Sequence, residues 1–180
     1  MTLSLHDVFD RFCERCDGNL IIGSSRRART TFVIDFFREY MKSQGMSEPH
    51  IDYMQVDAVW RDLTLGHISL ALEHENSHDM REFIAQEMGH LVDLKALVKV
   101  AIAYPHAGEE KTTLDEIVLL IQQRAIMTSD IFGERYLILF GFNTLQERKP
   151  AILWKGYFLD RVGKIVDERQ RVVFQRGKSK

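Results

Sequence analysis

The order of apolar patterns along the chain predicts one α/β domain with a mixed central β-sheet flanked by helices. Segments with a helical period alternate with short, β-rich apolar runs, which is the pattern of strands connected by helices. The 180 residues contain three prolines, no internal repeat and no low-complexity segment that would divide the chain. We therefore expect a single domain over residues 1–180, with a helical part at 1–50, a central part at 51–105, and a helix, strands and a basic tail at 106–180.

Four segments carry helical patterns. The second begins at Thr30 or Thr31, either of which could cap it, and places Phe32, Phe36 and Tyr40 on one apolar side. Asp79 is a capping residue at the start of the third. The predicted helices span residues 3–16, 30–43, 79–94 and 113–127.

The remaining apolar segments are typical of strands. In IDYMQVDAVW (51–60) the side chains alternate, so that Asp57 and Val59 face one way and Ala58 and Trp60 the other. HISLALEHEN (67–76) alternates in the same manner after a turn. Further strands are predicted at 98–104, 135–142 and 151–159, and the segment RVVF (171–174) is predicted to add an edge strand.

Composition limits the cellular setting. No apolar run approaches the roughly 18–20 residues that cross a bilayer, and the N-terminus MTLSLHDVFDRF has acids where a signal peptide has basic residues. We expect a cytoplasmic protein without a membrane segment. Cys13 and Cys16 form one CxxC pair inside an amphipathic helical segment, with no second pair, so they are expected to be ordinary reduced thiols.

Charge is unevenly distributed. Residues 135–180 carry eleven Lys/Arg and four Asp/Glu, a net charge of +7, while residues 1–134 carry thirteen against twenty-two, a net charge of −9. This asymmetry is compatible with a basic surface for phosphates beside an acidic site, and equally with a solvated C-terminal face and tail.

Three acids stand out at the ends of the central strands. Glu73 and Glu75 lie two apart, so both side chains point to one face, and antiparallel pairing would bring Asp57 beside them. Like charges at this distance raise one another's pKa values and are destabilising unless a cation offsets them. Mg²⁺ prefers such oxygen ligands. The alternative is that the three carboxylates are simply solvated at a strand end.

The segments DAVW (57–60), SLALEHEN (69–76) and LKALVKVAIAY (94–104) together resemble the PD-(D/E)xK nuclease superfamily, which has the restriction-endonuclease-like fold. The resemblance covers residues 30–105, with 51–105 as the expected nuclease core. Members hold Mg²⁺ with an acid on one strand and acid-x-Lys, sometimes acid-x-Glu, on the next. The resemblance implies that Asp57 is the first acid, Glu73 the second, Glu75 the third position and Glu39 the auxiliary acid of a preceding helix.

The lysine of the motif is absent here, since Glu75 occupies its position. Lys99 or Lys95 would have to supply a displaced positive charge. The resemblance implies hydrolysis of phosphodiester bonds in nucleic acid, expected to be DNA, with Asp57 and Glu73 binding Mg²⁺ or Mn²⁺ and Glu75 holding the metal or acting as general base. The basic C-terminal segment and Arg26, Arg27 and Arg29 would contact phosphates.

A homodimer or a protein partner would add specificity to so short a chain. A catalytically inactive binding or adaptor module of the same fold remains an alternative.

A second alternative uses the same residues. His74-Glu75-Asn76-Ser77-His78 satisfies HExxH, the zinc-protease pattern, with Glu87 or His90 as candidates for a third ligand. That pattern requires a helix, because only helical spacing brings both imidazoles onto one Zn²⁺. The β-like residues before it and the helix-poor Asn76-Ser77 disfavour this alternative.

Overall fold

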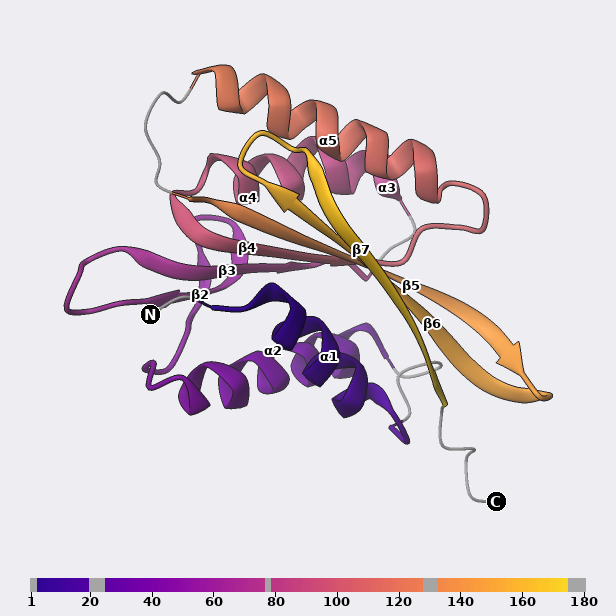
Figure 1. Cartoon of the computed structure of the whole chain (residues 1–180). Helices are drawn as coiled ribbons and strands as arrows, with labels where there is room; N and C mark the ends of the chain where they lie inside the picture. The colour runs from indigo at the N-terminus through magenta and orange to yellow at the C-terminus, as the bar shows by residue number, and fades with distance from the viewer. Residues whose placement is uncertain (1–2, 20–24, 77–78, 128–132, 175–180) are drawn as a thin grey trace.

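The computed structural model describes residues 3–19, 25–76, 79–127 and 133–174, which form a three-layered molecule with a sheet between two sets of helices (Figure 1). The helical elements are α1 (Leu5–Cys16), α2 (Arg26–Ser43), α3 (Met80–Glu82), a π-helical turn η1 (Phe83–Met88), α4 (Gly89–Asp93) and α5 (Glu110–Met127). The strands are β1 (His50–Tyr53), β2 (Val56–Arg61), β3 (Ile68–His74), β4 (Ala96–Ala103), β5 (Arg135–Gln146), β6 (Lys149–Asp160) and β7 (Ile165–Phe174).

The seven strands lie side by side in chain order. β3, β4 and β5 are parallel to one another, and every other neighbouring pair is antiparallel. The two parallel connections each run through helices, as parallel strands require. The predicted α/β domain with a mixed central sheet flanked by helices is therefore confirmed.

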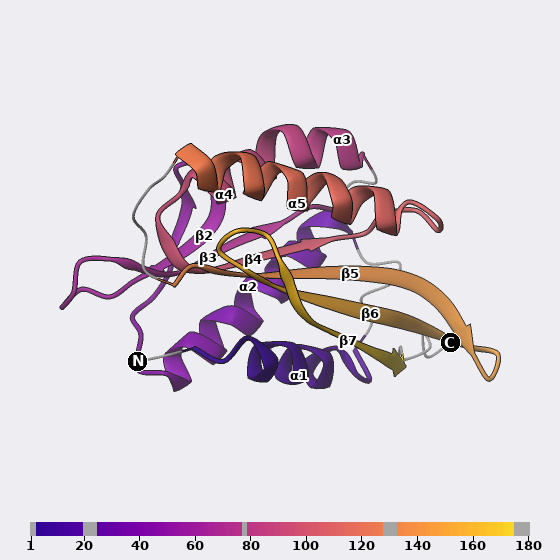
Figure 2. The same cartoon turned by 45° about the horizontal axis from the view of Figure 1, so that its top comes forward.

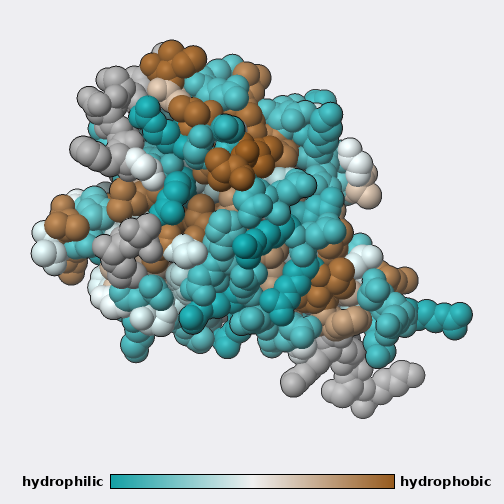
Figure 3. All heavy atoms as spheres, in the orientation of Figure 1, coloured by the Kyte–Doolittle hydropathy of each residue, from teal (hydrophilic) through white to brown (hydrophobic). Residues whose placement is uncertain are grey.

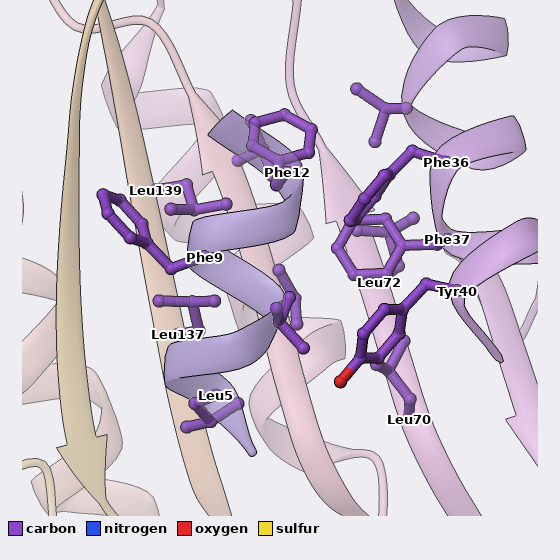
Figure 4. Packing of buried hydrophobic residues seen from close by; sticks show 14 of the residues in the cluster. Leu5, Phe9, Phe12, Phe36, Phe37, Tyr40, Leu70, Leu72, Leu137 and Leu139 are labelled. Carbon is purple, nitrogen blue, oxygen red and sulfur yellow. The ribbon is translucent and has the colours of Figure 1, made fainter. Parts of the chain in front are cut away.

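One face of the sheet is covered by α1 and α2 (Figures 1 and 2). Phe9 and Phe12 of α1 and Phe36 and Phe37 of α2 point toward the leucines of the central strands, as Figure 4 shows. The rings of Phe12 and Trp154 meet edge to face at 5.0 Å. Burial of such aromatic residues is the main stabilising contribution of this layer.

The opposite face is covered by α3, η1, α4 and α5. Phe83, Leu91, Ile117 and Ile121 pack there against the inner side chains of β3, β4 and β5. Asp79 caps α3 by accepting hydrogen bonds from the N–H groups of Arg81 and Glu82, at 3.1 Å each. The helical segment after β3 therefore starts where the sequence predicted.

Three local expectations were wrong. Helix α2 begins at Arg26, because Ser25 caps it by accepting a hydrogen bond from the N–H of Ala28 at 3.2 Å. The single strand expected at 51–60 is a hairpin, since Met54 and Gln55 adopt positive φ angles of 50° and 67° and reverse the chain. The final strand has ten residues rather than four.

Cys13 and Cys16 are buried on α1 and form no disulfide, as predicted. Desolvation raises the pKa of the Cys13 thiol to about 12. Within the described parts of the chain, no helix has the length and apolar character that crossing a membrane requires.

Candidate functional site

The hairpin of β2 and β3 brings two of the predicted acids together. Ala58 pairs with Leu72 across the strands, so the register continues to Asp57 opposite Glu73. Both carboxyl groups lie on the sheet face that carries α3, η1 and α4, and Glu73 is only 5% exposed. The backbone N–H of His74 donates a hydrogen bond of 2.8 Å to Oδ2 of Asp57, which fixes the position of that carboxyl group.

Glu75 follows directly after β3. Its backbone N–H donates to the carbonyl oxygen of Ile102 at 2.9 Å, so the end of β4 holds it in place. Its side chain meets that of Glu87, with which it shares a hydrogen bond. Asp57, Glu73, Glu75 and Glu87 thus form a group, named here the carboxyl cluster.

Glu87 enters the cluster from η1. A π-helical turn carries an extra residue per turn and so re-aims the side chains that follow, and such turns are frequent at functional sites. Sequence reasoning assigned Glu87 only as a candidate zinc ligand and missed this place beside Glu75, because the apolar period across 79–94 gives no signal for a local π turn. The structure adds a fourth carboxyl group to the predicted three.

Burial and mutual repulsion keep protons on the cluster. Desolvation, followed by the charges of Asp57 and Glu87, raises the pKa of Glu73 far above its ordinary value. Desolvation and the hydrogen bond with Glu75 raise the pKa of Glu87. Desolvation also raises the pKa of Asp57, although the hydrogen bond from the N–H of His74 opposes this shift. The cluster therefore holds fewer negative charges at neutral pH than four exposed acids would.

Two oxygen atoms of the cluster lack a partner. Oε2 of Glu73 and Oε2 of Glu87 are buried and have no hydrogen-bond partner among the described residues. Buried polar atoms are normally satisfied, so these two point to a missing donor or cation. Within the described ranges, no three His, Cys, Asp or Glu side chains already surround one point as metal ligands. The carboxyl groups lie instead as two interacting pairs, Asp57 with Glu73 and Glu75 with Glu87.

The remaining predicted residues lie elsewhere. Glu39 is on α2, across the sheet from the cluster, and pairs with Arg15 at 3.2 Å. Lys99 is fully buried, and its Nζ donates to the carbonyl oxygen of Val92 at 2.7 Å and to Glu134 at 3.2 Å. The structure does not bring Glu39 or Lys99 to the carboxyl cluster. Lys95 is exposed directly before β4.

The zinc-protease pattern does not fall on a helix at its first histidine. His74 is the last residue of β3, and the next helix begins at Met80. Its ring is buried on the opposite face of the sheet, where Nε2 lies 3.1 Å from the hydroxyl group of Tyr104. Desolvation, then the charge of Arg29, lowers its pKa to about 3. His78 lies outside the described residues.

The arginines at the start of α2 differ in their surroundings. Arg26 and Arg27 are exposed, whereas Arg29 lies over the ring of Tyr104 at 5.3 Å and donates to the carbonyl oxygen of Asn76 at 3.5 Å. Part of the basic C-terminal charge is paired, since Arg169 contacts Asp10 of α1 at 3.0 Å.

No known protein family, no curated protein and no solved structure matches the chain.

Proposed function

We propose that this chain is a divalent-metal-dependent nuclease of the PD-(D/E)xK type that hydrolyses phosphodiester bonds in nucleic acid. The observation that carries the proposal is the carboxyl cluster, in which Asp57 stands opposite Glu73 and two buried oxygens have no hydrogen-bond partner in the part of the chain that the structure describes. Solvated acids at a strand end would not be buried, and would not have raised pKa values. The cluster is therefore more than a polar strand terminus.

The order of elements supports the same class. α2, the three antiparallel strands β1–β3, the helical segment after β3 and the parallel strand β4 follow the core order of the restriction-endonuclease-like fold. Within that order the acids fall on the second and third strands, which is where the resemblance assigns them.

The residues fit a hard divalent cation by their chemistry. Mg²⁺ or Mn²⁺ would be held by Asp57 and Glu73, with Glu75 and Glu87 completing the oxygen donors. Such an ion supplies charge neutralisation at the scissile phosphate and acidifies a bound water. Glu75 would either hold the metal in this way or act as general base toward that water, since it is the acid at the motif's third position and its backbone is fixed by Ile102.

The deciding experiment measures metal binding and cleavage in parallel. Metal-stripped protein is titrated with Mg²⁺, Mn²⁺ and Zn²⁺ by calorimetry, and labelled single- and double-stranded DNA and RNA are incubated with each ion. We expect Mg²⁺ or Mn²⁺ to bind and to support cleavage, and Glu73→Gln to abolish both. Glu39→Gln is the matched control, because it makes the same change on the other side of the sheet.

Other outcomes assign the chain to the alternative classes. Zn²⁺ binding that requires His74 and His78 would favour a zinc hydrolase. Absence of both binding and cleavage would leave a nuclease-like binding or adaptor module. Equal loss of activity in Glu39→Gln and Glu73→Gln would contradict the site assigned here.

A further inference from the structure

Strands β5 and β6 extend past the rest of the sheet. Their pairing runs from Arg135 opposite Asp160 to Gln146 opposite Lys149, whereas β4 pairs with β5 only as far as Phe140. Residues 141–154 and the end of β7 at 172–174 form an arm, in which Ala151, Ile152 and Trp154 stay buried. Its largely exposed tip, residues 143–150, extends beyond the helices in Figures 1 and 2. The whole segment is named the β5–β6 arm.

The arm leaves the sheet beside the carboxyl cluster. β3, β4 and β5 are parallel, so their C-terminal ends share one edge, and Glu75 and the arm both lie at that edge. Cross-strand rows place Phe142, Leu153 and Val172 on the same face of the sheet as Glu73. The start of α5 lies on the same face, because Glu110 accepts hydrogen bonds from Lys155 and Tyr157, so a strand bound to the arm would pass this helix end to reach the cluster.

The shared face is apolar and partly open. Phe142 and Leu153 are partly buried, while Val172 and Phe174 are 38% and 39% exposed. The end of α1 fixes the end of β7, since Asp17 accepts a hydrogen bond of 3.0 Å from the N–H of Phe174. The aromatic ring of Phe174 is therefore presented from an ordered strand rather than from a loose end.

Basic side chains border this apolar face. Lys155 lies over the ring of Phe142 at 5.7 Å and is paired with Glu110 of α5 at 2.7 Å, whereas Arg148 and Lys149 are exposed at the tip. Figure 3 shows hydrophobic and hydrophilic side chains side by side where the arm projects at the right. Glu147 and Arg148 have positive φ angles of 51° and 62°, a turn that Asn-Gly would form with less strain.

We propose that the β5–β6 arm is a platform for single-stranded nucleic acid, which it guides toward the carboxyl cluster. Unpaired bases stack on Phe174, and Arg148 and Lys149 contact phosphates. Aromatic side chains with a basic border are the usual means of binding unpaired strands, because every base offers a π face. A duplex hides those faces, so the platform selects single strands. The proposal rests on the nuclease function for its substrate class but not for its test.

The test measures binding without cleavage. Fluorescence anisotropy of a labelled single strand, as DNA and as RNA, and of the matching duplex is recorded in EDTA. We expect single strands to bind more tightly than the duplex, and Phe174→Ala to weaken single-strand binding about 10-fold. Phe174→Leu is a second variant, which keeps an apolar side chain but removes the ring, and it should also weaken single-strand binding. Arg148→Glu with Lys149→Glu should weaken single-strand binding, and the affinity that remains should depend less steeply on salt concentration.

The matched control is Arg161→Glu with Lys164→Glu, the same charge change in the turn at the other end of β6 and β7. Equal loss in both charge variants, tighter binding of the duplex, or undiminished binding by Phe174→Ala would overturn the platform. Self-association through Phe174, seen by light scattering without strand binding, would overturn it too. Platform binding without metal-dependent cleavage would instead contradict the nuclease function alone.

Discussion

Oε2 of Glu73 and Oε2 of Glu87 are the residue-scale feature on which the proposed function rests. Both are buried without a partner among the described residues, and an unpaired buried oxygen costs about 1–3 kcal/mol. Protonation lowers the cost of burying the group as a charge but leaves the second oxygen unsatisfied. The cluster is therefore less stable as it stands than it would be with a cation or donor in place.

The raised pKa values predict how stability changes with pH in the absence of metal. Unfolded Glu73 loses its proton near 4.5, whereas the folded protein retains it to about 9. Between these values the folded protein binds more protons than the unfolded chain, so the free energy of unfolding falls as pH rises. Each such group contributes about 1.4 kcal/mol per pH unit. Glu73→Gln cannot titrate, so its stability should fall less steeply.

Denaturant unfolding of both proteins between pH 6.5 and 8 checks this. The window excludes pH values below 6.5, where the lowered pKa of His74 makes the free energy of unfolding rise with pH. It also ends at the pKa of Glu87, which is about 8. Glu39→Gln should follow the unmodified protein. Parallel pH profiles for the unmodified protein and Glu73→Gln would show that Glu73 ionises normally.

The sequence predicts only some of the acids that form the carboxyl cluster. The two-residue period places Asp57 and Glu73 on one face, and the hairpin register then brings them opposite. Glu87 depends on a π turn, which leaves no periodic signal. Lys99 was assigned correctly to a strand, but its amino group extends toward Val92 and Glu134. Residue spacing predicts the face on which a side chain lies, but not the direction in which a long side chain extends along that face.

At the scale of elements, close packing of α1 on β6 sets the spacing of two layers. A Cβ atom at Gly156 would lie 2.6 Å from Cδ2 and 2.9 Å from Cε2 of Phe9, so only glycine admits the ring at this point.

Helix periods and β-rich runs predicted most elements to within a few residues. The β1–β2 turn was missed because it uses Asp52, Met54 and Gln55 at positive φ rather than glycine.

Gly156→Ala should therefore destabilise the fold by about 1–3 kcal/mol, the usual cost of overpacking. Phe9→Leu in the same chain should recover part of that loss, because the smaller side chain makes room for the methyl group. A double-mutant cycle from denaturant unfolding measures the coupling. Gly89→Ala is the matched control, since its Cβ meets nothing within 4 Å and alanine favours helix α4. Additive effects of Gly156→Ala and Phe9→Leu would contradict the contact.

The turn of the arm supports a second element-scale prediction. Glu147 and Arg148 occupy left-handed conformations that cost non-glycine residues about 1–2 kcal/mol each. Glu147→Asn with Arg148→Gly should therefore raise the free energy of unfolding by about 1 kcal/mol. Thermal unfolding measures the gain, and the charge-matched variant Glu147→Gln with Arg148→Ala, which keeps the strain, should show none. An unchanged or lower melting temperature for the Asn-Gly variant would mean that this turn is not strained.

At the scale of the whole molecule, the sheet separates two faces of different character. The face with α1 and α2 carries the larger aromatic core, and its surface acids pair with arginines of β7, as Glu14 does with Arg171 at 3.7 Å. The other face carries the carboxyl cluster and the open side of the arm. Part of the basic charge of residues 135–180 is thus paired with acids of α1, while Arg148 and Lys149 are exposed at the tip of the arm.

The carboxyl cluster predicts that added Mg²⁺ or Mn²⁺ stabilises the entire fold and does so more strongly at higher pH. An ion that binds only the folded state adds about 2.7 kcal/mol at 100 times its dissociation constant. For a domain of this size that is a rise in melting temperature of about 5–10 °C. Because the cluster must release protons to bind the ion, the rise should be larger near pH 8 than near 6.5.

Thermal scans with Mg²⁺ or Mn²⁺ against EDTA at the two pH values measure both effects. Glu73→Gln and Glu87→Gln should each reduce the metal-dependent rise, whereas Glu39→Gln should retain it, because Glu39 pairs with Arg15 on the far side of the sheet. A rise that is independent of pH would mean that the ion binds carboxylates that are already ionised. That result would locate the metal among exposed acids and remove the carboxyl cluster from the mechanism.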